Sequence, residues 1–100
     1  MVRSPKLCHA PSSQNFRPND GEIDIIEAIN VMSANQMALH TTAGCTHPNG
    51  TYETGIPGGA DCSTAAGCTV TESSPNSFES GFALMGGGVW ACQFDVAGIL

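Results

Sequence analysis

The chain is poor in positive charge, and what little it has lies at one end. Its 100 residues include three Lys and Arg residues in total, and none of them follows Arg17. From Pro18 onward there are nine Asp and Glu residues and no Lys or Arg. Because binding to nucleic acid depends on Lys and Arg contacts to phosphate, we expect no nucleic-acid partner. We also expect no binding to an anionic membrane surface, because the acidic chain would be repelled by it. An uncharged polysaccharide meets no such repulsion.

Long apolar runs are also missing from the sequence. No stretch is long enough to span a bilayer, and residues 1–9 lack the apolar core of a signal peptide. Gly, Ser, Thr and Asn are frequent between short apolar runs, and no heptad or tandem repeat is present. This pattern is typical of many short strands joined by turns, so the expected fold class is all-β.

The most informative feature that is present is a group of three acids in the segment 21–27, Glu22, Asp24 and Glu27. In a regular strand alternate residues share a face, so Glu22 and Asp24 face one way and Glu27 faces the other. A β-bulge at Ile25-Ile26 would return Glu27 to the face of the other two acids. The carboxyl groups of Glu22 and Glu27 could then approach the roughly 5 to 5.5 Å that a retaining glycosidase requires.

The same segment is also compatible with an amphipathic helix. Its apolar residues fall at helical spacing as well, at Ile25, Ile26, Ile29 and Met32. Asn19 and Glu22 have the spacing of a helix capping box. Periodicity alone therefore leaves strand and helix open.

With its surroundings, the acidic segment resembles glycoside hydrolase family 16, and within it the fungal endo-1,3(4)-β-glucanases, or laminarinases. The resemblance extends from Pro18 to about Ile99 and implies a strand at the acids, within a two-sheet, concanavalin-like jelly roll. The other segments that carry it are Asn35-Gln36-Met37, Leu39-His40-Thr41, Gly44-Cys45, Asp61-Cys62, Ala66-Gly67-Cys68 and Gly86-Gly87-Gly88-Val89-Trp90-Ala91. Two positions depart from the family pattern, Arg17 in place of Trp and Ala28 in place of Gly, so one aromatic platform for sugar is absent.

The resemblance implies roles for the three acids. Glu22 is the expected nucleophile, Asp24 its hydrogen-bonding neighbour, and Glu27 the acid/base. His40 is a candidate substrate-binding residue that faces the cleft beside Glu22, although it could instead be a hydrogen-bonded residue of the sheet. Trp90, on an expected strand after the glycines, is a second candidate for sugar binding, with filling of the sandwich core as the commoner role of a lone Trp.

The implied activity is hydrolysis of internal β-1,3 or β-1,4 bonds in laminarin-type or mixed-linkage β-glucan by double displacement. We expect no cofactor and no metal, a monomer, and secretion of the full-length protein. Two alternatives remain open, a non-catalytic β-glucan-binding relic and a gene-model fragment that does not fold. Because a jelly roll of this family needs well over twice this length, we expect residues 18–100 to be a partial catalytic domain and residues 1–17 an aberrant or disordered leader.

The five cysteines, at positions 8, 45, 62, 68 and 92, favour an oxidising compartment. The resemblance covers Cys45, Cys62 and Cys68, and any of the three pairings among them is possible. Cys8 and Cys92 are expected to be free thiols. A zinc site formed by the three covered cysteines and His47 is the alternative, but its spacing lacks the usual Cys-x2-4-Cys pattern.

Overall fold

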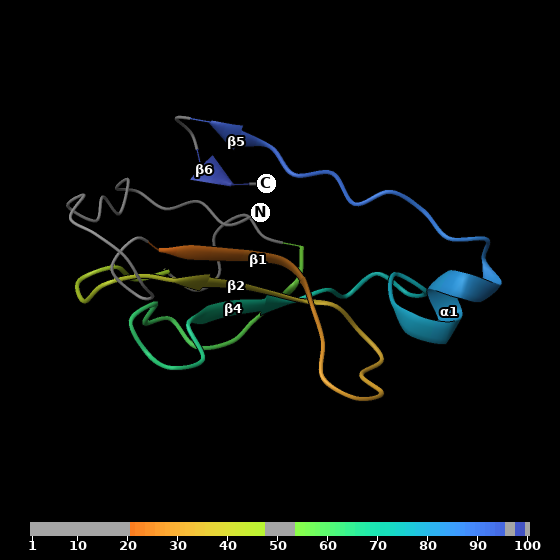
Figure 1. The fold of residues 1–100 in the computed structure, drawn as a ribbon, viewed down its shortest axis with the longest axis horizontal. Helices are drawn as coiled ribbons and strands as arrows, with labels where there is room; N and C mark the ends of the chain where they lie inside the picture. The colour runs from red at the N-terminus through yellow and green to blue at the C-terminus, as the bar shows by residue number, and fades with distance from the viewer. Residues whose placement is uncertain (1–20, 48–53, 96–97, 100) are drawn as a thin grey trace.

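The computed structural model describes residues 21–47, 54–95 and 98–99, which form mainly antiparallel β-structure (Figure 1). A four-stranded sheet has the order β1-β2-β4-β3, and a separate two-stranded ribbon pairs β5 with β6. The strands are β1 (Glu22–Glu27), β2 (Gln36–His40), β3 (Ile56–Pro57), β4 (Cys68–Thr71), β5 (Phe94–Asp95) and β6 (Gly98–Ile99). One short helix, α1, spans Glu79–Leu84. The expected all-β class is confirmed.

The acidic segment is a strand and not a helix. β1 pairs antiparallel with β2, and β2 pairs in turn with β4. The β-branched residues Ile23, Ile25 and Ile26 favour this extended conformation, because branched side chains pack well on a pleated surface. Pairing with a neighbouring strand thus resolves the ambiguity that periodicity left open.

The predicted β-bulge is present in β1. Asp24 lies opposite Ala38, and Glu27 lies opposite Gln36. Between these two pairs β1 contains two residues, Ile25-Ile26, whereas β2 contains one. The extra residue shifts the register and reverses the facing of every later side chain in β1. The bulge prediction is therefore confirmed.

The core of the described residues is small and centres on β2 and β4. Its buried hydrophobic side chains are Ala38, Cys62, Cys68 and Val70. Larger apolar side chains remain exposed, among them Ile23, Ile26, Ile29, Ile56 and Val89. In a β-sandwich, the apolar face of one sheet packs against a second sheet. The described part of the chain therefore leaves much of its apolar surface uncovered.

After α1 the chain turns back and passes over the sheet toward β5 and β6 (Figure 1). Gly88 lies against Phe82, since a Cβ atom at Gly88 would be 2.8 Å from Phe82 Cε2. The expectation that Trp90 lies on a strand is wrong, because β5 begins only at Phe94. The segment that contains Trp90 crosses above the sheet and pairs with none of the described strands.

None of the helices in the described ranges has the length and apolar character to cross a membrane.

A disulfide joins Cys62 to Cys68 and closes the loop that leads into β4. This is one of the three pairings that the sequence left open. Cys45 is disulfide-bonded as well. Cys92 is a free, exposed thiol, as expected, while Cys8 lies outside the described residues.

Candidate active site

The three acids of β1 share one face of the sheet. Each lies opposite an alternate residue of β2, in the pairs Glu22–His40, Asp24–Ala38 and Glu27–Gln36. Alternate residues of a strand point to the same side, and residues directly opposite each other across two strands share a face. We call this side of the sheet the acidic face. It exists because the bulge brings Glu27 into line with the two earlier acids.

His40 belongs to the acidic face and contacts its central acid. His40 Nε2 lies 3.2 Å from Asp24 Oδ2. Both side chains are mostly buried, with 20% and 19% of their surface exposed. Because Glu22 is the cross-strand neighbour of His40, the imidazole lies beside both Glu22 and Asp24. The structure therefore brings His40 to the expected side of the sheet, and its role in substrate binding stays a prediction.

Gly67 supports His40 from the neighbouring loop. A Cβ atom at Gly67 would lie 3.0 Å from both Nδ1 and Cε1 of His40, and 2.7 Å from the backbone oxygen of Leu39. Gly67 also has a φ of +68°, a conformation that other residues rarely adopt. The next residue is Cys68, which is held by the disulfide to Cys62. Glycine at this position thus allows the backbone to approach the imidazole closely.

Asn35, the residue just before β2, connects the two ends of the bulge. Its side chain is completely buried. Asn35 Nδ2 donates a hydrogen bond of 2.8 Å to the backbone oxygen of Ile25, and Asn35 Oδ1 accepts one of 2.9 Å from the backbone N–H of Glu27. Asn35 belongs to a segment that carries the family resemblance, but the sequence alone indicated no function for it. The available signal was the bulge itself, because a bulge leaves backbone groups that need polar partners.

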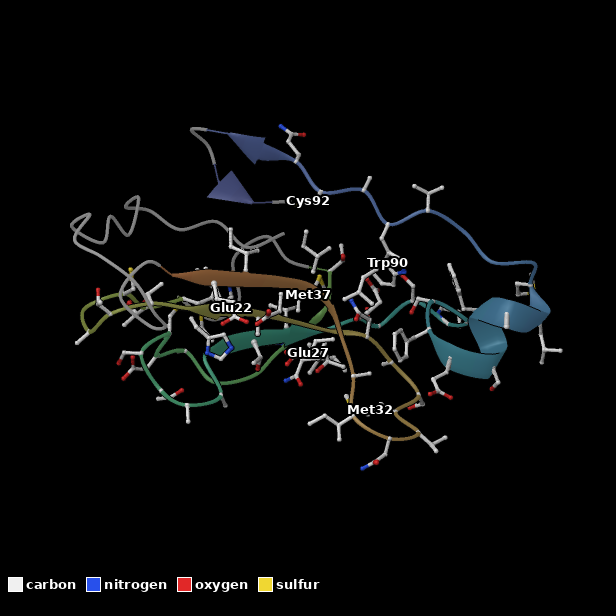
Figure 2. All side chains as sticks on the ribbon, in the orientation of Figure 1. Glu22, Glu27, Met32, Met37, Trp90 and Cys92 are labelled. Carbon is white, nitrogen blue, oxygen red and sulfur yellow. A yellow bond between two sulfur atoms is a disulfide. The ribbon has the colours of Figure 1, made fainter. Side chains whose placement is uncertain are left out.

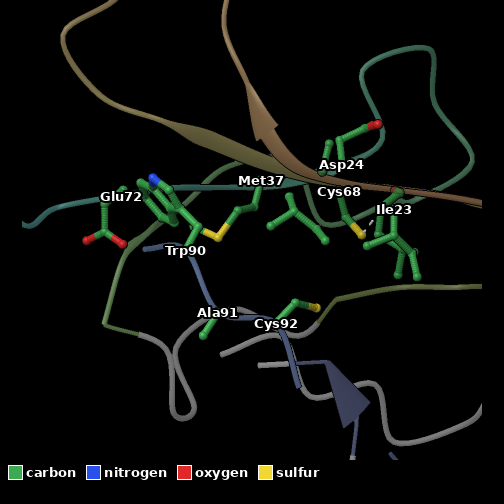
Figure 3. Close-up of a pocket in the computed structure, with 11 residues that line it drawn as sticks. Ile23, Asp24, Met37, Cys68, Glu72, Trp90, Ala91 and Cys92 are labelled. Carbon is green, nitrogen blue, oxygen red and sulfur yellow. Dashed lines mark hydrogen bonds between the residues drawn. The ribbon is translucent and has the colours of Figure 1, made fainter. Parts of the chain in front are cut away.

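Trp90 lies away from the acidic face. It lines a pocket of about 270 Å³ together with Ile23, Met37 and Cys92. Ile23 and Met37 alternate with the acidic-face positions of their strands, so this pocket lies on the opposite face. Figure 3 shows Asp24 pointing away from Trp90 and Cys92. Figure 2 shows that Trp90 and Cys92 come from the segment above the sheet. This location fits the core alternative for Trp90, and sugar binding by Trp90 remains only a prediction.

Two acids outside the acidic face have altered acidity. The backbone N–H of Ser74, 2.7 Å from Glu72 Oε1, lowers the pKa of Glu72. The hydroxyl of Ser63, and then its backbone N–H, lower the pKa of Asp61. In both cases a hydrogen bond stabilises the ionised carboxylate within a local turn. These two shifts therefore reflect turn structure.

The described residues contain no group of three or more His, Cys, Asp or Glu side chains arranged to hold a metal ion. The zinc alternative also loses two thiols, since Cys62 and Cys68 are joined in a disulfide. The acidic face itself presents carboxyl groups and one imidazole. Such groups can act as nucleophile, acid and base.

The family described as the XgeA-like catalytic domain of glycoside hydrolase family 16 matches residues 11–100 of this chain. The match begins before the expected domain boundary at Pro18. It covers most of the sequence, including the complete acidic face. The chain therefore belongs to glycoside hydrolase family 16, and the resemblance found in its sequence is confirmed.

Relatives from several fungi agree with this assignment. An endo-1,3(4)-beta-glucanase of Emericella nidulans is 38% identical over 80 residues, which are 78% of this chain and 13% of the relative. A protein of Neosartorya fischeri named as a probable endo-1,3(4)-beta-glucanase is 39% identical over 80 residues, 77% of this chain and 12% of that protein. The chain thus spans only about an eighth of the length of these relatives.

A solved structure with a similar fold is an elongating family 16 beta-1,3-glucosyltransferase. It is 40% identical in sequence with a TM-score of 0.72, and the match covers 83% of this chain and 29% of that one. Together with the antiparallel sheet, this likeness identifies the described residues as part of the family's jelly-roll β-sandwich.

Proposed function

We propose that the full-length protein is a retaining endo-β-glucanase that cleaves internal bonds of 1,3- or mixed-linkage 1,3(4)-β-glucan. Glu22 acts as the nucleophile and Glu27 as the acid/base, while Asp24 tunes Glu22 through hydrogen bonding. His40 contributes to the substrate-binding surface from the neighbouring strand. The names of the Emericella nidulans and Neosartorya fischeri relatives support the choice of substrate.

The observation that carries this proposal is the register of β1 against β2. With the bulge, Glu22 and Glu27 share a face and lie on either side of Asp24. Without it, Glu27 would face the opposite side, and no pair of glutamates could flank one glycosidic bond. Retaining hydrolysis needs two carboxyl groups on the same side, close enough to act on one anomeric centre.

In the proposed reaction, the carboxylate of Glu22 attacks the anomeric carbon while Glu27 protonates the departing glycosidic oxygen. The bond between sugar and leaving group breaks, and a covalent glycosyl-enzyme forms on Glu22. Glu27, now ionised, then removes a proton from water, which attacks the same carbon and releases Glu22. Two inversions at one carbon give a product with retained configuration.

The test of the proposal is Glu22→Ala in the full-length protein. The unaltered protein should release reducing sugar from laminarin, and the variant should release none that can be measured. Azide should restore cleavage of an activated aryl β-glycoside by the variant and yield the α-glycosyl azide, because azide then attacks directly from the nucleophile's side. A β-glycosyl azide would indicate instead that Glu22 is the acid/base. Absence of hydrolysis by the unaltered protein, with retained binding to laminarin, would favour the non-catalytic relic.

Glycosyl transfer is a second candidate function. The solved structure with a similar fold is named an elongating glucosyltransferase, and it is 40% identical to this chain over the matched region, which is 29% of that protein. A sugar hydroxyl in place of water would release the glycosyl-enzyme as a longer chain by the same two-step chemistry. Mass spectrometry of products from a laminari-oligosaccharide separates the two functions, since transfer gives products longer than the substrate and hydrolysis gives only shorter ones.

The proposed site of action is outside the cell, with the protein as a monomer. The disulfide between Cys62 and Cys68, and the disulfide-bonded state of Cys45, support an oxidising compartment. Detection of the protein in culture medium, and its elution volume in size-exclusion chromatography, test the two statements separately.

A further inference from the structure

The bulge in β1 creates a local problem of hydrogen bonding. The extra residue interrupts the ladder, so backbone groups beside it lose the partners they would have in a regular pair. At this bulge the affected groups include the carbonyl of Ile25 and the N–H of Glu27, and both bond to the side chain of Asn35. One side-chain amide therefore provides hydrogen-bond partners for backbone groups on both sides of the bulge.

Asn35 suits this task for a reason of geometry. An amide carries a donor and an acceptor on the same carbon, so it can bond a carbonyl and an N–H at once. An ionised Asp lacks the donor, and the hydroxyl of Ser or Thr cannot reach two separated groups with the same geometry. The side chain of Asn35 is also fully buried, so water does not compete for these bonds.

Asn35 is held firmly at its own backbone. Its carbonyl accepts a hydrogen bond of 2.9 Å from the N–H of Glu72, just after β4. It also directly precedes Gln36, the first residue of β2. Asn35 therefore links the bulge of β1, at the edge of the sheet, to the two central strands β2 and β4.

From this arrangement we propose that Asn35 is a positioning residue, which fixes the bulge and thereby directs Glu27 toward the acidic face. The inference rests on the proposed role of Glu27 as acid/base. If the bulge relaxed to a regular pair, Glu27 would turn to the opposite face. Asn35 thus acts on the reaction only through the backbone of Glu27.

The test compares Asn35→Ala with the unaltered full-length protein. We expect kcat on laminarin to fall about 100-fold, the order of loss that follows a displacement of about 1 Å in a catalytic group. KM should change little. Cleavage of an aryl glycoside whose leaving group needs no proton should fall far less, because that reaction does not depend on Glu27 as an acid. Ser73→Ala is the matched control, since it removes a side-chain hydrogen bond to Thr54 without touching the bulge, and it should leave both rates unchanged.

A second readout, amide hydrogen exchange, does not depend on activity. The Glu27 amide should exchange slowly in the unaltered protein and much faster in Asn35→Ala. A folded variant with normal exchange, or with equal loss on both substrates, would overturn the proposal. The unaltered protein could be inactive while its Glu27 amide exchanges slowly, and that amide could exchange much faster in Asn35→Ala. In that case the proposed function would fail, but the positioning of the bulge by Asn35 would stand.

Asn35→Asp covers the case in which the alanine variant does not fold. It keeps the size of the side chain and the acceptor for Glu27, whereas its ionised form loses the donor to Ile25 and places a negative charge beside that carbonyl. We expect the same selective loss on laminarin, about tenfold, the value of roughly one hydrogen bond. Should neither variant fold, exchange in the unaltered protein decides, because a Glu27 amide that exchanges as fast as exposed loop amides would contradict the proposal.

Discussion

His40 Nε2 lies 3.2 Å from Asp24 Oδ2, which links β2 to the central acid of β1 on the acidic face. The cross-strand neighbour of His40 is Glu22, so the imidazole is adjacent to two of the three acids. Gly67 lies against the same ring from the loop before β4. The contact between Asp24 and His40 thus involves β1 and β2, and the loop before β4 packs against its imidazole.

The contact between Asp24 and His40 should be visible as energetic coupling. We expect Asp24→Asn to lower kcat/KM on laminarin less than either Glu22→Ala or Glu27→Gln, because its proposed role is tuning. Combined with His40→Ala, the loss should differ from the sum of the single losses by about 0.5 to 3 kcal/mol, as is usual for residues in contact. Steady-state kinetics of the four proteins measures this difference. Strict additivity would show that the contact does not matter to the reaction, and complete loss in Asp24→Asn would give Asp24 a primary role.

Glu27→Gln should slow the cleavage of natural glucans selectively. General acid catalysis contributes about 10² to 10⁴-fold, and only substrates with poor leaving groups need it. We therefore expect a loss of this size on laminarin and a much smaller loss on an activated aryl glycoside, in the full-length protein. Glu79→Gln is the matched control, because Glu79 is an exposed residue of α1, outside the acidic face. Equal slowing of both substrates by Glu27→Gln would contradict the assignment of Glu27 as the acid.

Gly67→Ala tests whether close packing against His40 matters. Both Gly67 and Gly44 have positive φ, +68° and +99°, so alanine at either position should cost about 1 to 2 kcal/mol of backbone strain. A Cβ atom at Gly44 would meet nothing within 4 Å, whereas one at Gly67 would collide with the Leu39 carbonyl and the His40 ring. Gly67→Ala should therefore lower the free energy of unfolding more than Gly44→Ala, and should also reduce kcat. Denaturant unfolding of both variants, together with laminarin kinetics, gives the comparison. Equal effects of the two substitutions would mean that the loop adjusts without cost.

The acidic face could be predicted from the sequence because it follows from local rules. Alternation in a strand fixes Glu22 and Asp24, and the extra residue before Glu27 requires a bulge if all three acids are to act together. The choice of strand over helix required the family resemblance, since the apolar spacing of the segment fits both. The resemblance also drew attention to His40, whose contact with Asp24 then depends on the pairing of β1 with β2.

The features that the sequence did not reveal, or left open, depend on how the chain folds in three dimensions. Asn35 bonds to Ile25, ten residues away, and only the folded loop between β1 and β2 brings the two together. The location of Trp90 depends on how the chain turns at α1 and crosses the sheet, which no local pattern specifies. Cys62 pairs with Cys68 across a short loop, one of three arrangements that the spacing alone allowed.

The 100-residue chain expressed by itself should not fold cooperatively and should not cleave laminarin. Its described residues bury four hydrophobic side chains, whereas nine large ones remain exposed. Fixing the backbone costs roughly 1 to 2 kcal/mol per residue, and burial of an apolar face is the main effect that offsets this cost. In a sandwich that burial comes from a second sheet, and only a two-stranded ribbon of the described chain lies above the first. Differential scanning calorimetry should show no sharp transition, and product analysis should show no oligosaccharides. A cooperative transition accompanied by oligosaccharide release would instead show that these residues form a minimal enzyme, with the acidic face and its supports sufficient to bind and cleave a glucan chain.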